Sequence, residues 1–155
     1  MRITKYNLQF DENRTNVLVK DFTKNITEVQ ALNSPEEITK MFNYVFNANK
    51  QAEEYVYLLA LDTKMNCKGI FEVSHGAVNY SVVNSREIFI RLCLCGAVYF
   101  VVAHNHPSGE ISPSKEDVNV TNRLKQAGEI LGIELLDHII IGEDKYLSLK
   151  EEKLM

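Results

Sequence analysis

The feature that most constrains the fold of this chain is an apolar run that ends in two histidines. The run Ala97–Ala103 has no polar residue, which is typical of a central strand buried on both faces. His104 and His106 follow directly, and side chains two residues apart on an extended chain project to the same face. Further on, Ser112-Pro113-Ser114 predicts a helix start, and Asp117 lies one turn after its last serine. The strand end and the helix start are therefore predicted to bring two imidazoles and a carboxylate together.

These three groups are ligands that suit zinc, and three protein ligands leave a fourth tetrahedral position for water. Such a set is typical of a catalytic site rather than a closed structural one. Zinc lowers the pKa of a bound water to about 7 and polarises a carbonyl oxygen. The alternative is that the two histidines are surface or capping residues of a strand end. Ser114 and Asp117 at helix-start spacing favour the metal site.

Strands and helices alternate along the rest of the chain. Ser34-Pro35-Glu36-Glu37 predicts a capped helix start with a complete capping box, and apolar residues at helical spacing follow to Phe46. Further helices are predicted over 86–95 and from 112–114 to about 131, the latter facing the core through Val118, Thr121, Leu124, Ala127 and Leu131. Strands are predicted over 54–61, 67–74, 133–141 and 146–149, with 76–83 continuing the second past a bend. This order predicts a single α/β domain.

Residues 1–33 contain two weakly apolar segments separated by a polar stretch, which leaves a hairpin or an irregular arm open. The domain organisation predicted is therefore an N-terminal arm over 1–33 and the α/β domain over 34–155.

Composition argues against some classes of protein. The net charge of -4 gives no electrostatic footprint for nonspecific binding of nucleic acid. Neither a secretion signal nor an apolar run of about 20 residues for a membrane span is present in the sequence. The odd number of cysteines, 3, indicates reduced thiols rather than a disulfide framework. A cytoplasmic location is expected.

His104-x-His106, then seven residues, then Ser114-x-x-Asp117 resembles the full signature of the JAMM (MPN+) metalloprotease family. The chain is more closely similar to the RadC-like branch (JAB domain) of that family. The further motifs similar to that branch are Leu61–Lys64, Ser74–Gly76 with Asn79, Leu135–Gly142 and Tyr146–Ser148. The resemblance covers about residues 50–150.

The resemblance implies a deaminase-like three-layer α/β sandwich around a curved mixed sheet. It implies one Zn²⁺ held by His104, His106 and Asp117, with water as the fourth ligand. Ser114 would stabilise the tetrahedral oxyanion, and a glutamate on the first strand of the sheet would be the general base.

Three glutamates compete for the role of base, and the alternative that the chain has no such base is also open. Glu54 begins the strand ending at Leu61 and matches a RadC-like position. Glu53 is adjacent and would point to the opposite side of an extended chain. Glu72 lies in the next strand and would approach the site if the strand order differed. His138, in an apolar strand, is interpreted as a buried histidine that supports the site rather than as a ligand.

Two departures from the RadC-like pattern stand out. Asn84-Ser85-Arg86-Glu87 replaces a usual His-Pro-Arg-Glu run, which affects only the entry to the second helix. Residues 1–33 lack the glycine pattern of the helix-hairpin-helix region that many members use to contact DNA.

The first functional hypothesis is a zinc metallopeptidase or isopeptidase that hydrolyses a peptide or amide bond. The second is a nucleic-acid accessory protein, associated with DNA repair or a mobile element, whose metal site is not catalytic. The expected partner is a peptide or amide substrate; charge argues against nucleic acid, and no membrane association is expected.

Overall fold

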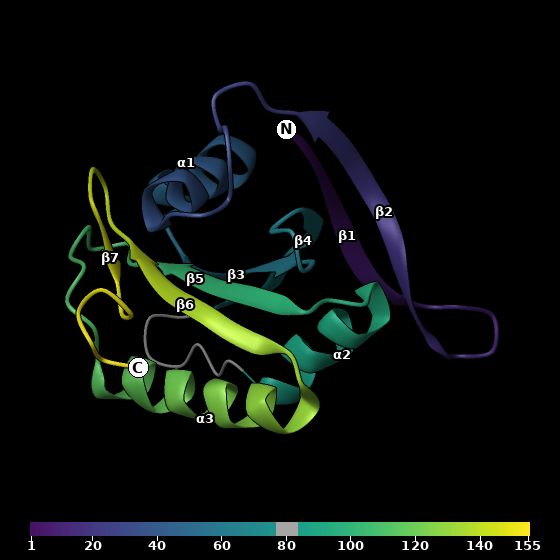
Figure 1. Cartoon of the computed structure of the whole chain (residues 1–155). Coiled ribbons are helices and arrows are strands. Elements are labelled where there is room, and N and C mark those ends of the chain that lie inside the picture. The colour runs from purple at the N-terminus through teal and green to yellow at the C-terminus, as the bar shows by residue number, and fades with distance from the viewer. Residues whose placement is uncertain (77–83) are drawn as a thin grey trace.

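A mixed β-sheet lies at the centre of the computed structural model, which describes residues 1–76 and 84–155 (Figure 1). Among these residues the sheet has 7 strands in the order β2-β1-β4-β3-β5-β6-β7. The strands are β1 (Arg2–Phe10), β2 (Asn16–Asn25), β3 (Glu54–Leu61), β4 (Cys67–Gly76), β5 (Tyr99–Asn105), β6 (Glu134–Ile141) and β7 (Tyr146–Ser148). The helices are α1 (Pro35–Phe46), α2 (Ser85–Cys95), α3 (Lys115–Leu131) and a short 3-10 turn, η1 (Ala48–Lys50). The predicted α/β fold with a mixed sheet is confirmed. The predicted continuation of the second strand to residue 83 lies outside the described residues.

The middle of the sheet consists of β3, β5 and β6. β3 runs antiparallel to β5 with Val56 opposite His104, and β6 runs parallel to β5 with His138 opposite Val102. Every residue from 56 to 61 and from 100 to 105 is buried, which explains the continuous apolar runs in the sequence. Because β5 has a hydrogen-bonded neighbour on each side, the end of the strand that carries His104 is firmly held.

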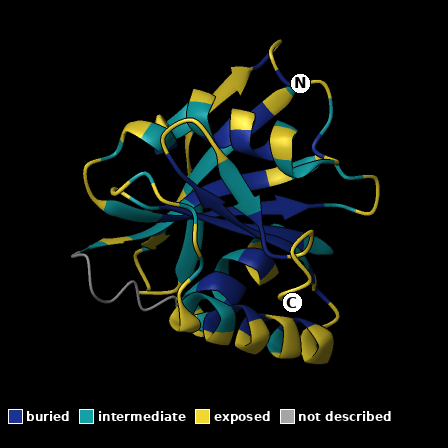
Figure 2. Ribbon diagram, turned by 90° about the vertical axis from the view of Figure 1, so that its left-hand side faces the viewer, coloured by how far each residue is buried: buried dark blue, intermediate teal, exposed yellow. Residues whose placement is uncertain are grey.

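Helices cover both faces of the sheet, so the structure has three layers with buried strands between them (Figure 2). One core, under α1, contains Ile38, Met41, Phe42, Tyr57 and Leu59. The other, under α2 and α3, contains Val56, Leu58, Ile88, Leu92 and Leu124. Successive residues of β3 therefore face different cores. Since His104 lies opposite Val56, it faces the α2–α3 layer.

The helix starts agree with prediction except at one carboxylate. Ser34 accepts a hydrogen bond from the Glu37 N–H at 3.2 Å, and the Asn84 side chain caps α2. The prediction of a complete capping box for α1 is wrong, because the Glu37 side chain bonds to other groups. The Glu37 carboxylate accepts from the backbone N–H of Gln30 at 3.1 Å and pairs with Lys40 at 2.9 Å. The segment before α1 folds back toward the helix and takes the acceptor that a capping box would use.

The buried face of α3 differs from the predicted one. Its buried residues are Val120, Thr121, Leu124 and Gly128, whereas Leu131 is 52% exposed. A Cβ on Gly128 would lie 2.3 Å from the backbone oxygen of Ile133. The end of α3 thus packs directly against the chain that enters β6 at Gly128, and Leu131, the last residue of the helix, is left exposed.

Of the two forms left open for residues 1–33, the structure has the hairpin, formed by β1 and β2. β1 pairs in parallel with β4, with Lys5 opposite Ile70, so the hairpin extends the common sheet and β2 forms one edge. No helix among residues 1–76 and 84–155 combines the length and the apolar character needed to cross a membrane.

Candidate metal centre

Three side chains from two elements converge at the end of β5. His104 belongs to β5, His106 follows its last residue, and Asp117 lies in the first turn of α3. The Nε2 atoms of the two histidines are 3.0 Å apart. The Asp117 carboxylate approaches both rings, with Oδ1 3.3 Å from His104 Nε2 and Oδ2 3.9 Å from His106 Nε2. Their potential ligand atoms all lie within 4.8 Å of one another, so the group could hold a metal ion.

The orientation of the His106 ring is fixed by the loop that follows it. His106 Nδ1 lies 2.8 Å from the backbone oxygen of Glu110, and a carbonyl oxygen only accepts, so Nδ1 carries the proton. In the neutral ring, Nε2 therefore presents a lone pair to His104 and Asp117. Lone pairs directed at one point suit a cation, and the donor set of two imidazoles and a carboxylate fits zinc.

His104 is the buried member of the group, with 2% of its surface exposed. Its Nδ1 lies 2.8 Å from Nε2 of His138, which is also buried. Burial lowers the pKa of both rings, that of His138 to about 4, and the positive charge that each ring would carry disfavours protonation of its neighbours. Both histidines are therefore neutral near pH 7, the state in which a histidine can bind a metal.

Asp117 both caps its helix and faces the histidines. Its Oδ2 accepts from the Ser114 N–H at 2.7 Å and from the Ser114 hydroxyl at 2.8 Å, while Ser114 Oγ accepts from the Asp117 N–H at 3.1 Å. This reciprocal capping box leaves Oδ1 directed toward His104. Ser114 lies beside the site, with its hydroxyl hydrogen engaged by the carboxylate. Donation to a substrate oxygen requires that hydroxyl to rotate.

The strand register separates the three glutamates. Val56 lies opposite His104, so Glu54, two residues earlier in β3, shares the face of the histidines. Glu53 is 62% exposed, and its carboxylate lies 3.6 Å from His75 Nδ1. Glu72 lies opposite Tyr57, on the face under α1.

Sequence reasoning missed the role of Asn105, the residue between the two histidines. Its side chain accepts from the Tyr55 N–H at 2.8 Å and donates to the Glu53 backbone oxygen at 2.9 Å. These bonds bracket Glu54 on both sides and extend the β3–β5 ladder beyond its last backbone pair. A buried asparagine at a strand end was the available signal, because such a side chain needs partners.

The loop after His106 packs closely against the chain that leaves β6. The His106 N–H donates to the Ile141 oxygen at 3.0 Å. A Cβ on Gly142 would lie 2.5 Å from the Gly109 oxygen and 2.8 Å from Ile111 Cγ2. Gly109 itself has φ +78°, a left-handed conformation that glycine adopts without strain. Two glycines therefore let the ligand loop seat against the β6–β7 turn.

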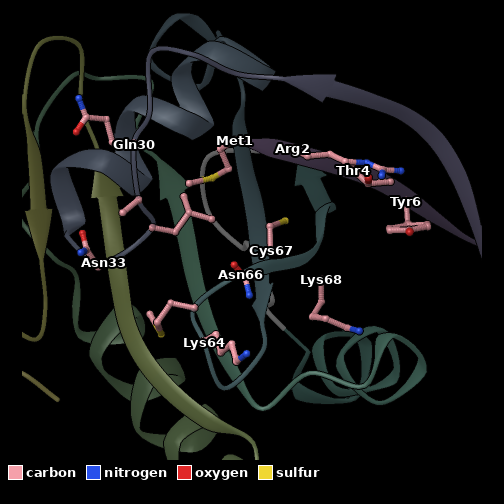
Figure 3. A pocket seen from close by; sticks show the side chains of 13 residues that line it. Met1, Arg2, Thr4, Tyr6, Gln30, Asn33, Lys64, Asn66, Cys67 and Lys68 are labelled. Atoms are coloured by element: carbon pink, nitrogen blue, oxygen red, sulfur yellow. The ribbon is translucent and has the colours of Figure 1, made fainter.

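A cavity of about 830 Å³ lies elsewhere, between β1, the segment before α1 and the β3–β4 turn (Figure 3). Arg2, Lys64 and Lys68 are among its lining residues; the described lining residues include no carboxylate and none of His104, His106 and Asp117. Burial raises the pKa of the Cys67 thiol in its wall to about 11, so this thiol is a poor nucleophile near neutral pH. The cavity is thus separate from the metal centre.

The fold and the ligand set define a class: an α/β protein with a candidate metal site at the end of a central strand. The RadC-like JAB domain model matches residues 32–154, and the chain belongs to this family. The match begins after the β1–β2 hairpin.

Curated relatives are similar over the same region. A UPF0758 protein of Carboxydothermus hydrogenoformans is 46% identical over 121 residues, covering 78% of this chain and 53% of the relative. One of Clostridium tetani is 46% identical over 103 residues, covering 66% and 45%. One of Clostridium botulinum is 44% identical over 121 residues, covering 78% and 52%. The chain spans about half the length of the curated relatives it matches.

Proposed function

We propose that this chain is a zinc-dependent hydrolase that cleaves a peptide, isopeptide or related amide bond. The observation that carries the proposal is the convergence of His104, His106 and Asp117 at the end of a buried strand, with ligand atoms within 4.8 Å of one another. Zinc is the metal proposed, because two imidazoles and one carboxylate are a common protein ligand set of catalytic zinc sites. Membership of the RadC-like JAB family is consistent with this assignment.

When bound, zinc would supply Lewis acidity, lowering the pKa of a water molecule and polarising the substrate carbonyl. In this proposal the Glu54 carboxylate accepts a proton from the attacking water and returns it to the leaving amine. The β3–β5 register supports Glu54 over Glu53 and Glu72, since only Glu54 shares the histidines' face. The Ser114 hydroxyl would rotate from Asp117 to donate to the oxygen that gains negative charge.

The substrate proposed is a peptide or amide rather than a nucleic acid. The net charge of -4 offers little attraction for a phosphate backbone, whose neutralisation by cations dominates nonspecific binding.

Metal binding is tested with a variant that separates ligation from capping. Asp117→Asn keeps an acceptor for Ser114 but removes the charged ligand, and Glu116→Gln makes the same charge change on the adjacent first-turn residue. Zinc affinity, measured by competition with a chromophoric chelator, should fall more than about 100-fold in Asp117→Asn and stay near wild type in Glu116→Gln. Equal zinc affinity of wild type and Asp117→Asn would refute the ligand assignment.

The hydrolytic step is tested separately with a peptide and amide library. Glu54→Gln should lower kcat by about 10²- to 10⁴-fold with zinc still bound, because the amide cannot accept the proton. Glu53→Gln and Glu72→Gln are the matched controls and should remain near wild type. Undiminished turnover in Glu54→Gln would exclude Glu54 as the base.

A further inference from the structure

A buried chain of hydrogen bonds runs from His104 to the backbone of the helix that carries Asp117. His104 Nδ1 lies 2.8 Å from His138 Nε2, and His138 Nδ1 lies 2.6 Å from Thr121 Oγ1. Thr121 Oγ1 in turn lies 2.6 Å from the Asp117 backbone oxygen. The chain thus links β5, β6 and α3, and both of its ends are candidate ligands.

The polarity of these bonds follows from the one group that cannot donate. A carbonyl oxygen only accepts, so the single hydroxyl hydrogen of Thr121 points to Asp117. Thr121 Oγ1 must then accept from His138, which places the proton of His138 on Nδ1. Nε2 of the neutral ring is left as an acceptor, so His104 donates to it from Nδ1. The lone pair of His104 therefore sits on Nε2, the atom that faces His106 and Asp117.

Burial makes this ordering strict. Thr121 is 0% exposed and His138 1% exposed, so bulk water cannot readily replace either partner. A reversed chain would leave the hydroxyl oxygen and the Asp117 carbonyl oxygen facing each other without a hydrogen. Two oxygens 2.6 Å apart with no hydrogen between them repel each other, which favours the single arrangement described.

We propose that Thr121 and His138 are positioning residues that hold His104 in the tautomer whose Nε2 can bind the metal. The inference rests on the proposed metal centre for its purpose, but the proton positions can be measured without a metal. It extends the centre beyond its ligands: α3 supplies Asp117 directly and, one turn later, supplies the hydroxyl that orients His104. Groups that orient ligating histidines in this way typically change metal affinity by about 10- to 100-fold when removed.

Two substitutions at Thr121 distinguish hydrogen bonding from packing. Thr121→Val keeps the branched shape and removes the hydroxyl, whereas Thr121→Ser keeps the hydroxyl and removes a methyl group. If the hydrogen-bond chain orients His104, zinc affinity falls about 10- to 100-fold in Thr121→Val and stays within about threefold in Thr121→Ser. An equal loss in both variants, or a larger loss in Thr121→Ser, would show a packing role and overturn the proposal.

Ring ¹⁵N NMR of the full chain, stripped of metal and held at about pH 8, reads the proton positions directly. Wild type and Thr121→Ser should carry the ring proton of both His138 and His104 on Nδ1, and Thr121→Val should lose this preference. A wild-type His138 protonated on Nε2 would overturn the proposal. This measurement needs no variant to fold. Absence of zinc binding in wild type would instead refute the proposed metal centre. The proton positions of His104 and His138 would still test the hydrogen-bond chain.

Discussion

Replacing Asn105 with alanine should destabilise the protein more than its single side chain suggests. The side chain is 2% exposed and bonds to one backbone N–H and one backbone oxygen, at Tyr55 and Glu53. Both bonds are partly buried, and a group left without a partner there costs about 1–3 kcal/mol, so the pair predicts a loss of about 3 kcal/mol. For a chain of this size this loss corresponds to a fall in Tm of roughly 6–12 °C.

The assay is urea and thermal unfolding of the metal-free protein, so that changes in zinc affinity do not enter. Asn49→Ala is the matched control, because the Asn49 amide makes a similar bond to the Glu143 backbone oxygen at 3.0 Å in an exposed setting. Water can replace that bond, so the control should lose less than about 1 kcal/mol. Equal losses in Asn105→Ala and Asn49→Ala would refute the reasoning.

The same substitution carries a functional expectation. Because the Asn105 bonds bracket Glu54 and touch neither ligand ring, turnover should fall more than tenfold while zinc affinity changes less, on the order of threefold. Parallel losses in the two quantities would contradict a role in positioning Glu54.

Three other predictions follow from close packing and burial. Gly128→Ala should lower the free energy of unfolding in urea by about 2 kcal/mol, because the added Cβ would lie 2.3 Å from the Ile133 oxygen. In an ordinary helix interior the same substitution raises the free energy of unfolding by roughly 1 kcal/mol. A rise in Gly128→Ala would refute the close approach. Gly142→Ala should push the ligand loop away from the β6–β7 turn and weaken zinc binding about tenfold without altering a ligand; unchanged affinity would show that the loop gives way freely. Burial lowers the pKa of His138 to about 4. Below about pH 6.5 the unfolded state therefore binds more protons than the folded state. As the pH falls from about 6.5 toward 4, the free energy of unfolding should decrease by up to about 1.4 kcal/mol per pH unit. His104 acts in the same direction, and a flat profile in metal-free protein between about pH 7 and pH 5 would contradict both shifts.

The convergence of His104, His106 and Asp117 could be predicted from the sequence because it depends on local structure. His104 and His106 follow one strand and Asp117 starts the next helix, so strand alternation and helix spacing are enough to bring them together. The same holds for the start of α3 after Ser112-Pro113-Ser114, although the reciprocal capping box of Ser114 and Asp117 was not predicted.

The rest of the site depends on contacts between distant segments. The choice among Glu53, Glu54 and Glu72 turns on the register of β3 against β4 and β5, and a shift of one residue reverses every face. The irregularity between Val56 and Tyr57 in the β3–β4 pairing cannot be read from composition. The buried bonds of His138 require β6 beside β5, which no local pattern specifies.

The fold shows the same division. Helix starts were predictable. The Glu37 carboxylate, however, accepts from the Gln30 N–H instead of completing a capping box, because the segment before α1 folds back toward the helix. The α3 face was misjudged because hydrophobicity gives no weight to Gly128, whose lack of a side chain makes it buried.

The capping box formed by Ser114 and Asp117 has a consequence for how similar sequences are interpreted. Oδ2 of Asp117 accepts the hydrogen bonds of the helix start and Oδ1 lies 3.3 Å from His104, so the same aspartate serves the helix and the candidate site. The capping box stabilises the helix start whether or not a metal is bound, and His106 lies outside it, partly exposed. In a chain of this kind, Ser-x-x-Asp alone therefore indicates a capped helix start, and a candidate metal site requires the pair of histidines as well.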